Sequence, residues 1–513
     1  MTVIRTTQVS PTTEKGFSVL GRAKQLNAGV HKAYIDGQWV EPGGGEVWQH
    51  RHPASGEPDF TIARSSASDV DRAVRAARRA FDEGPWRQMR ARERKLILRP
   101  IGDLVRAAEK ELAELQSLDN GLPIAIGSGF RFSGSFAADL FEYHIGWIDK
   151  LDGSVPPVFS SHADAQMLTL REPVGVVAAV TPFNAPVMQF AQKVAPALAA
   201  GCTVVFKPSE YASNVAALFV RLIEQLDLPP GVINLVPGDA STSAALFNHP
   251  LIDKIAFTGR REVGEIILRA AAPGIKRVQL ELGGKSPSIV FDDVEDISAT
   301  ARYAMSLVSM GLSGQLCSTQ TRALVHRSVY SEFIAAATEQ LADVRIGDSF
   351  DAAVTSAPLV NAAAADRVER LIQGALQEGA RHVAGGDRVT ELPGGNWITP
   401  TILADVSPSM TIARTEVFGP VLSVIPFDDE EDAIRIANDS EYGLSAGVYT
   451  RNPTRAIRVA RALRTGTVGI NSLFVYPPPA PFGGYKTSGL GREGGRQGFE
   501  DYLETKTISI PLG

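Results

Sequence analysis

The sequence predicts an α/β protein in which parallel sheets are covered by helices. From residue 174 to 281, short apolar segments alternate with longer amphipathic ones. The strand candidates are 174–180, 203–207, 232–236, 254–257 and 276–281, and the helix candidates are 187–199, 213–226, 240–248 and 261–272. A second alternating block runs from about residue 286 to 470. Repeats of this length are typical of parallel sheets with helices on their faces.

Length and composition narrow the class of protein. The chain has 513 residues, a net charge of −6 and 44% hydrophobic residues, which suits about three domains. The mild acidity offers no basic face for nucleic acid. The two cysteines lie far apart, so we expect no disulfide framework and a reducing compartment. The first residues lack the apolar core of a signal peptide, and the densest apolar run is far shorter than a membrane span, so we expect a cytoplasmic protein without a membrane partner.

The segments before residue 174 predict helices and a pair of exposed strands. Ser68, with Asp71 three residues on, is expected to cap a helix. A second long helix, from about residue 91 to 118, should kink or break at Pro100. Residues 150–170 are expected to form exposed strands that could pair with another subunit.

Chemically notable side chains follow four of the five strand candidates. Asn184 follows the first, Lys207 and Glu210 follow the second, Thr258-Gly259 follows the fourth, and Glu281 follows the fifth. Ligands of parallel α/β sheets bind at the carboxyl ends of the strands. We therefore expect these residues to border a binding site.

The expected nucleotide site lacks the usual glycine fingerprint. No G-x-G-x-x-G follows the first strand of the sheet. Thr258 and Gly259 instead lie where a strand passes into a helix, and backbone N–H groups at a helix N-terminus suit a pyrophosphate, although ordinary capped helices look similar. A carboxylate at Glu210 can bind ribose hydroxyls and repel a 2′-phosphate, which favours NAD over NADP without excluding NADP.

A carboxylate and a thiol each lie in a glycine-rich turn. The turns are Glu281-Leu282-Gly283-Gly284-Lys285 and Gly314-Gln315-Leu316-Cys317. Such turns let backbone approach a substrate closely, and the pair suits a base that activates water and a nucleophile that attacks carbon. A lone cysteine is more often a small buried hydrophobe, so the pair alone only suggests chemistry. Pairing Cys317 with His326 as a cysteine hydrolase is a weaker alternative, because His326 ends a strand candidate.

In order and spacing, the motifs resemble the aldehyde dehydrogenase superfamily, of the NAD(P)-dependent, non-acylating type, from about residue 31 to 510. The motifs are Thr181-Pro182-Phe183-Asn184, Lys207-Pro208-Ser209-Glu210, Phe257-Thr258-Gly259, Glu281-Leu282-Gly283-Gly284-Lys285, Gly314-Gln315-Leu316-Cys317, Glu416-Val417-Phe418-Gly419-Pro420, and Pro481-Phe482-Gly483-Gly484-Tyr485-Lys486 with Ser488-Gly489. The resemblance implies oxidation of an aldehyde to a carboxylate with NAD through a cysteine thiohemiacetal and thioester.

The resemblance also implies roles for single residues. Cys317 corresponds to the nucleophile, Asn184 to the side-chain donor for the oxyanion, and Glu281 to the general base. Lys193 and Glu493 match a pair linked to proton relay. No metal is implied.

A larger set matches cofactor-binding positions of the family. Lys207 and Glu210 correspond to ligands of the adenosine ribose, and Glu416 to a ligand of the nicotinamide ribose with Phe418 packed nearby. Arg260 is a departure, since relatives often have serine there. The full set is Thr181, Pro182, Phe183, Lys207, Ser209, Glu210, Gly238, Thr258, Gly259, Arg260, Val263, Leu282, Gly283, Glu416 and Phe418.

The resemblance divides the chain into three parts. It implies a Rossmann-like, parallel-sheet cofactor domain from residues 1–149 and 171–280, and an α/β catalytic domain from residues 281–499. Residues 150–170 and 500–513 are expected to form a small oligomerisation sheet that builds a homodimer or homotetramer.

Two substitutions bear on the substrate. Ala185 stands where many relatives have an aromatic residue and Gln192 where some have tryptophan, so we expect a wide tunnel that accepts a bulky, aromatic or branched aldehyde. A CoA-acylating dehydrogenase is an alternative, but it has no need of a base such as Glu281. A catalytically inactive binding or structural homologue is a second alternative, and the joint retention of Cys317, Asn184, Glu281 and Glu416 argues against it.

Overall fold

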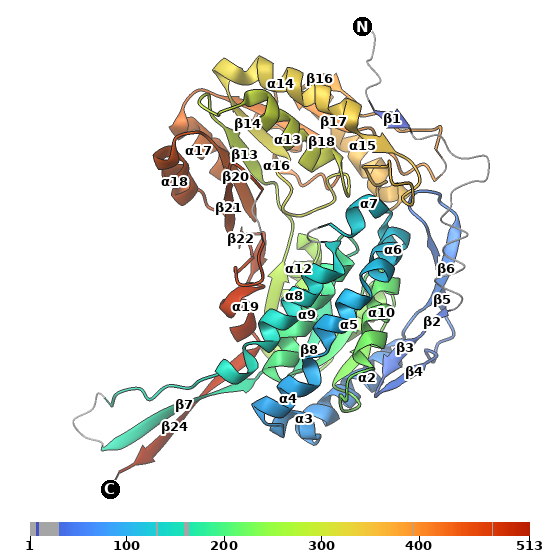
Figure 1. Ribbon diagram of the computed structural model, residues 1–513, viewed down its shortest axis with the longest axis vertical. Coiled ribbons are helices and arrows are strands. Elements are labelled where there is room, and N and C mark those ends of the chain that lie inside the picture. Colours follow the sequence, from blue (N-terminus) through green and yellow to red (C-terminus); the bar gives the residue numbers. More distant parts are fainter. Residues whose placement is uncertain are drawn as a thin grey trace.

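The protein consists of two sheet-centred lobes and a two-stranded arm that projects from them (Figure 1). The computed structural model describes residues 7–9, 30–129, 132–158, 164–392, 394–473 and 476–512. Most of the first 30 residues lie outside these ranges. Within them, no helix combines the length and apolar character needed to cross a membrane.

The first lobe contains an eight-stranded sheet whose five central strands run parallel, as the sequence predicts. In sheet order the strands are β23 (Gly489–Leu490), β12 (Arg277–Glu281), β11 (Lys254–Thr258), β8 (Val176–Val180), β9 (Thr203–Lys207), β10 (Ile233–Leu235), β3 (Ala33–Ile35) and β4 (Gln38–Val40). β23 comes from far along the chain and pairs antiparallel with β12, with Gly489 opposite Glu281.

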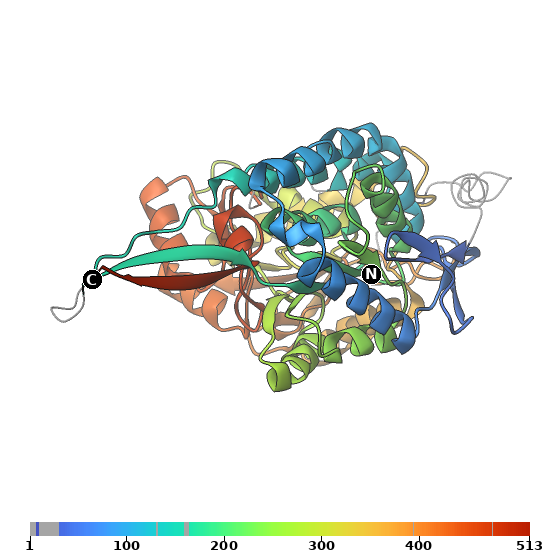
Figure 2. The same ribbon diagram turned by 90° about the horizontal axis from the view of Figure 1, so that it is seen from below.

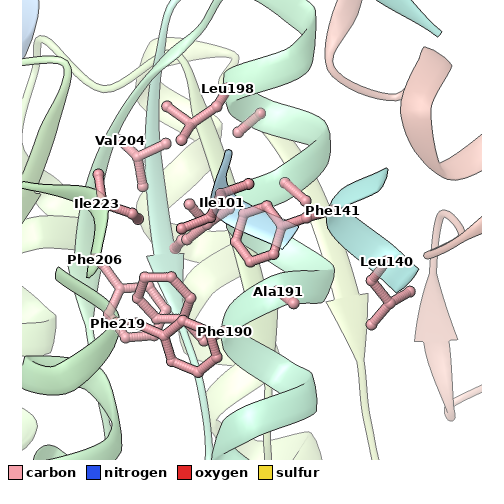
Figure 3. Close-up of a cluster of buried hydrophobic side chains, with 14 of the residues drawn as sticks. Ile101, Leu140, Phe141, Phe190, Ala191, Leu198, Val204, Phe206, Phe219 and Ile223 are labelled. Atoms are coloured by element: carbon pink, nitrogen blue, oxygen red, sulfur yellow. The ribbon is translucent and has the colours of Figure 1, made fainter. Parts of the chain in front are cut away.

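Both faces of this sheet are buried, because successive side chains of a strand point to opposite sides. Val177, Ala179 and Phe206 pack into one core, whereas Val176 and Val205 pack into the other. One face carries α6 (Glu109–Asn120), α8 (Gly134–Ile145), α9 (Pro186–Ala200) and α10 (Ser213–Ile223), and the other carries α2 (Ala67–Asp82), α11 (Ala240–Asn248) and α12 (Arg261–Ala271). Figure 3 shows the first core, where Phe190 of α9 stacks on Phe219 of α10 with ring centroids 4.4 Å apart.

The second lobe repeats this arrangement around a seven-stranded sheet. Its strands in order are β16 (Arg381–Ala384), β17 (Thr401–Ala404), β18 (Val421–Phe427), β14 (Arg322–His326), β13 (Pro287–Val290), β20 (Ser445–Tyr449) and β21 (Thr467–Ile470). Helices cover its two faces: α13 (Ile297–Ser309) and α14 (Tyr330–Glu339) on one, and α15 (Ala362–Gln377), α17 (Glu430–Asn438) and α18 (Pro453–Ala462) on the other.

The arm is an antiparallel pair of long strands, β7 (Ala165–Pro173) and β24 (Leu503–Pro511). Figure 2 shows it leaving the body of the molecule and ending near the C-terminus. The remaining strands form small sheets, namely β1 (Gln8–Val9) with β15 (Arg345–Ile346), β2 (Val30–His31) with β6 (Pro58–Ala63) and β5 (Val47–Arg51), and β19 (Tyr442–Gly443) with β22 (Tyr485–Lys486).

Two details of the N-terminal helices differ from the sequence prediction. The cap of α2 is Ser66, whose hydroxyl accepts from the Asp69 N–H while the Asp69 carboxylate accepts from the Ser66 N–H, so the expected cap at Ser68 is wrong. Both serines precede an aspartate by three residues, and only the packing of α2 decides between them. The long helix is broken not only at Pro100 but also at Ala108, giving α4 (Ala91–Leu98), α5 (Ile101–Ala107) and α6. The short helices are α3 (Pro85–Gln88), α7 (Ile124–Gly127), α16 (Thr411–Arg414) and α19 (Gly495–Glu500).

Replacing Ser66 or Ser68 with alanine tests which of the two serines caps α2. Ser66→Ala removes a reciprocal cap and should lower the free energy of unfolding by about 1 kcal/mol. Ser68→Ala, inside the first turn, should leave it nearly unchanged. Urea unfolding followed by circular dichroism measures both, and equal losses in the two variants would contradict the assignment of the cap.

Candidate active site

The thiol and the carboxylate predicted from sequence come from different lobes and meet at their junction. Glu281 is the last residue of β12, and Cys317 lies in the loop between α13 and β14. A side chain at Gly284 would collide with the carbonyl oxygen of Cys317. The turn after Glu281 can therefore approach the thiol loop this closely only with glycine at that position.

The loop that carries Cys317 is held by a buried glutamine. The Gln315 amide nitrogen donates to the carbonyls of Leu312 (2.9 Å) and Pro358 (3.0 Å), and its oxygen accepts from the Val360 N–H (3.0 Å). Every hydrogen-bonding group of that side chain is thus used on backbone, which fixes the loop. Gly314 adopts a φ of +72° and packs against the Gly419 carbonyl, where a side chain would not fit.

Asn184 lies beside this loop, after the carboxyl end of β8. It is buried, with 5% of its surface exposed, and its amide nitrogen donates to the Gln315 carbonyl at 2.8 Å. An amide nitrogen carries two hydrogens, so one remains for a further acceptor. The preceding carbonyl, of Phe183, accepts from the Asn120 amide at 2.9 Å, which anchors the Asn184 loop to the end of α6.

Glu281 is a buried carboxylate to which the described residues offer no hydrogen bond. Only 2% of its surface is exposed, and both of its carboxylate oxygens lack a partner within those parts of the chain. Burial, reinforced by the negative charge of Glu493, raises the pKa of Glu281 well above its usual value. A carboxylate in this state is a stronger base than one in water, which suits proton abstraction.

Lys193 and Glu493 form a buried ion pair behind Glu281. The Lys193 Nζ lies 2.5 Å from Glu493 Oε1, and both side chains are at most 1% exposed. Lys193 belongs to α9 and Glu493 precedes α19, so segments 300 residues apart meet here. The lysine partly offsets the charge of Glu493 on Glu281. The three groups form one electrostatic cluster.

A cleft of about 270 Å³ extends from Cys317 to the N-terminus of α12. Twelve of the residues singled out from sequence line it: Pro182, Phe183, Asn184, Thr258, Gly259, Arg260, Glu281, Leu282, Gly283, Cys317, Glu416 and Phe418. The Glu416 carboxylate accepts from the Gly284 N–H at 3.0 Å, and a side chain at Gly283 would displace it. Burial raises the pKa of Glu416 to about 7.

The other residues singled out from the sequence do not line the cleft. Lys207 and Glu210 follow β9 with Nζ and Oε2 3.7 Å apart, and burial lowers the pKa of Lys207. Lys193 and Glu493 lie behind Glu281. Thr181, Ser209, Gly238 and Val263 are the remaining members of this group.

Arg367 borders the cleft and was not found from the sequence. It projects from α15, and its two terminal nitrogens donate to the carbonyls of Glu416 and Val417, both at 2.5 Å. These bonds hold the turn in which Phe418 has a φ of +53° and contacts Phe183 edge to face. One arginine in an amphipathic helix carries no sequence signal, because its carbonyl partners belong to another segment.

A second, smaller cavity opens on the other side of Cys317. Its free volume is about 30 Å³. Cys317 and Asn184 border both spaces. The other lining residues are Phe132, Ala185, Met188, Gln189, Gln192, Leu316, Ser318, Tyr476 and Phe482.

His326 does not belong to this site. Cys317 precedes β14, and His326 ends it, so about five residues of extended chain, roughly 16 Å, separate the two. The His326 ring contacts Ser328 at 2.7 Å. A cysteine-hydrolase pair of Cys317 and His326 is thereby excluded.

The fold and site define a class: an α/β protein with a partly exposed thiol that borders both a large cleft at the carboxyl ends of a parallel sheet and a smaller cavity. Residues 39–508 match the model of the aldehyde dehydrogenase family. The chain belongs to this family, and its chemistry is the oxidation of an aldehyde.

Individual relatives agree with this assignment. Aldehyde dehydrogenase 1 of Tanacetum cinerariifolium is 41% identical over 96% of this chain and 98% of its own length. The mitochondrial benzaldehyde dehydrogenase of Antirrhinum majus is 40% identical over 94% of this chain and 89% of its own. The betaine aldehyde dehydrogenase of Staphylococcus aureus, solved with NAD+, superposes with a TM-score of 0.92 at 36% identity, covering 97% of this chain and 98% of that one.

The two cysteines should differ in reactivity. Cys317 is partly exposed, whereas Cys202 is fully buried and burial raises the pKa of its thiol to about 11. Because the thiolate is the reactive form, iodoacetamide at mildly alkaline pH should label Cys317 and spare Cys202 until the protein unfolds. Mass spectrometry of tryptic peptides measures this, with Cys317→Ala as the unlabelled control. Comparable labelling of Cys202 in the folded protein would contradict the assignment.

Proposed function

We propose that this protein oxidises an aldehyde to a carboxylate with NAD+ through a covalent adduct on Cys317. The observation that carries the proposal is the position of the Cys317 thiol between the large cleft and the small cavity, with the buried carboxylate of Glu281 lining the same cleft. This arrangement supplies a nucleophile, a base and separate spaces for cofactor and substrate.

The cleft suits NAD. The Glu416 carboxylate lines the cleft against Gly283, where a side chain would displace it, and it can accept from ribose hydroxyls. Gly259 and Arg260 lie at the start of α12, where N–H groups and a guanidinium favour a pyrophosphate. Glu210, beside Lys207, suits the adenosine ribose and favours NAD, although NADP stays possible. NAD+ bound in this cleft would supply the hydride acceptor that the oxidation of the adduct to a thioester requires.

The protein's own groups carry the remaining steps. The Cys317 thiolate attacks the aldehyde carbon, and the free hydrogen of the Asn184 amide stabilises the resulting oxyanion; one such donor contributes about 3 kcal/mol. Glu281 then takes a proton from the water that hydrolyses the thioester. Lys193 and Glu493 lie next to Glu281 in the electrostatic cluster and provide the route by which that proton leaves.

The preferred aldehyde is proposed to be bulky, aromatic or branched. Ala185 and Gln192 leave room, and the rings of Phe132, Tyr476 and Phe482 offer apolar walls for a flat group. The free volume of the cavity is only about 30 Å³, so we expect a ring-bearing substrate to shift some of the lining side chains. Met188, with three rotatable bonds, is the wall residue best able to move.

We place the domain division at the boundaries expected from sequence: residues 1–149 and 171–280 bind the cofactor, 281–499 hold the thiol, and 150–170 with 500–513 assemble subunits. The two-stranded arm supports the assignment of residues 150–170 and 500–513 to subunit assembly, because among the described strands β7 and β24 pair only with each other. Leu170, Ile508 and Ile510 on the arm are 37–41% exposed. A homodimer or homotetramer would cover them. The two cysteines lie far apart in the sequence and form no disulfide with each other, which supports a cytoplasmic location.

The first test follows NADH formation with aliphatic and aromatic aldehydes in the absence of CoA. Wild-type protein should turn over, and Cys317→Ala should lose all activity because no adduct can form. Turnover that requires CoA would identify the acylating alternative. Retained NAD binding with no turnover on any aldehyde would favour an inactive homologue.

The pH dependence tests Glu281 as the base. Only the carboxylate form accepts a proton, and its pKa is raised, so deacylation should rise about tenfold per pH unit up to that pKa and then level off. Glu281→Gln should still give a burst of about one NADH per site, followed by slow, pH-independent turnover. Rapid-mixing kinetics measures both phases. A pH profile in the Glu281→Gln variant that matches wild type would rule out this role.

A further inference from the structure

Two glutamines of α9 face the small cavity next to Cys317. Gln189 and Gln192 are three residues apart and therefore lie on the same side of the helix. They are 6% and 3% exposed. Both amides are thus buried at the place where an aldehyde must lie to reach the thiol.

The amide oxygens of both glutamines are buried and have no hydrogen-bond partner among the residues that the structure describes. Two other buried glutamines use both ends of the amide: Gln315 bonds to backbone groups, and Gln279 donates to the Arg492 carbonyl and accepts from the Tyr502 hydroxyl. Gln116 and Gln320 each keep one amide atom unpaired but bond through the other. An unpaired buried amide costs about 1–3 kcal/mol. Such groups in native proteins call for a ligand or an ordered water.

The rest of the cavity wall limits what that ligand group can be. The described lining contains no charged side chain. A cationic or anionic substituent would be buried without a counter-charge, which is costly. A neutral hydroxyl can donate to an amide oxygen and accept from an amide nitrogen, so it satisfies a glutamine in either orientation of the amide.

We propose that the amides of Gln189 and Gln192 select aldehydes that carry a hydroxyl group on an otherwise apolar, ring-bearing body. The inference rests on the proposed function, because it assumes that the cavity receives the aldehyde. Phe132, Phe482 and Met188 pack against the apolar body, and the glutamines bind the hydroxyl. A substrate without that hydroxyl leaves the amide oxygens of both glutamines buried without a hydrogen-bond partner.

The strength of the preference for a hydroxylated aldehyde follows from whether the two amides are paired or left unpaired. A site built to hydrogen-bond a substrate hydroxyl discriminates strongly against the analogue that lacks it, because its own polar groups are left unpaired. With one or two amides satisfied, kcat/KM for the hydroxylated aldehyde should exceed that of a same-sized apolar analogue by about 10- to 100-fold.

The experiment compares the isomers of hydroxybenzaldehyde with the methylbenzaldehydes of the same substitution pattern, which are similar in size. Wild-type enzyme should favour at least one hydroxy isomer by the stated factor. The double variant Gln189→Met and Gln192→Met, which keeps side-chain size, should bring the ratio close to one by losing activity on the hydroxylated substrate alone. Thermal unfolding checks that the variant is folded.

Met188→Leu is the matched control, since it alters the same cavity without changing its polarity and should change kcat/KM for both substrates alike. Calorimetric binding of both aldehydes to Cys317→Ala provides a readout independent of turnover and should show the same preference. Wild type that oxidises methylbenzaldehydes as well as hydroxybenzaldehydes, or a preference that survives in the double variant, overturns the proposal. Failure of all aldehydes to react would instead contradict the proposed function itself.

Discussion

The whole site depends on one close approach between backbones. Glu281 belongs to the sheet of the first lobe and Cys317 to a loop of the second, and Gly284 brings the two together by offering no side chain to the Cys317 carbonyl. The cleft, the cavity and the electrostatic cluster are arranged around that contact. Arg367 of the second lobe stabilises this contact, because it donates to the carbonyls of Glu416 and Val417 and so holds their turn in place. The Glu416 carboxylate in turn accepts from the Gly284 N–H.

Several buried polar groups without a partner border the cleft and the cavity. In the described chain, the Asn184 oxygen, both Glu281 oxygens and the oxygens of Gln189 and Gln192 are buried without a partner. Folding gains nothing from burying such groups, and stability alone would select apolar side chains there. The fold tolerates them because the large cores on both faces of each sheet supply the compensating burial.

Much of the fold and of the candidate site could be predicted from the sequence, and the physical reason differs from one element to the next. The central strands and helices of the first sheet follow from hydrophobic periodicity, and a parallel sheet collects its functional side chains at the carboxyl ends of strands, which located Asn184, Thr258 and Glu281. The α2 cap could not be decided, because Ser66 and Ser68 offer the same local pattern and only tertiary packing selects one. Arg367 could not be found at all, since its partners are backbone carbonyls about 50 residues away.

The order of the segments along the chain has a consequence for biosynthesis. Tyr476, Phe482 and Glu493 all come after β21, the last strand of the second sheet, and between Phe482 and Glu493 the chain forms β23, which pairs with β12 beside Glu281. A ribosome therefore finishes the Cys317 loop well before it makes Tyr476 and Phe482 of the cavity wall and Glu493, the partner of Lys193. In a nascent chain the thiol is thus made before its cavity is complete, and β24, the last strand of the arm, follows only after Glu493.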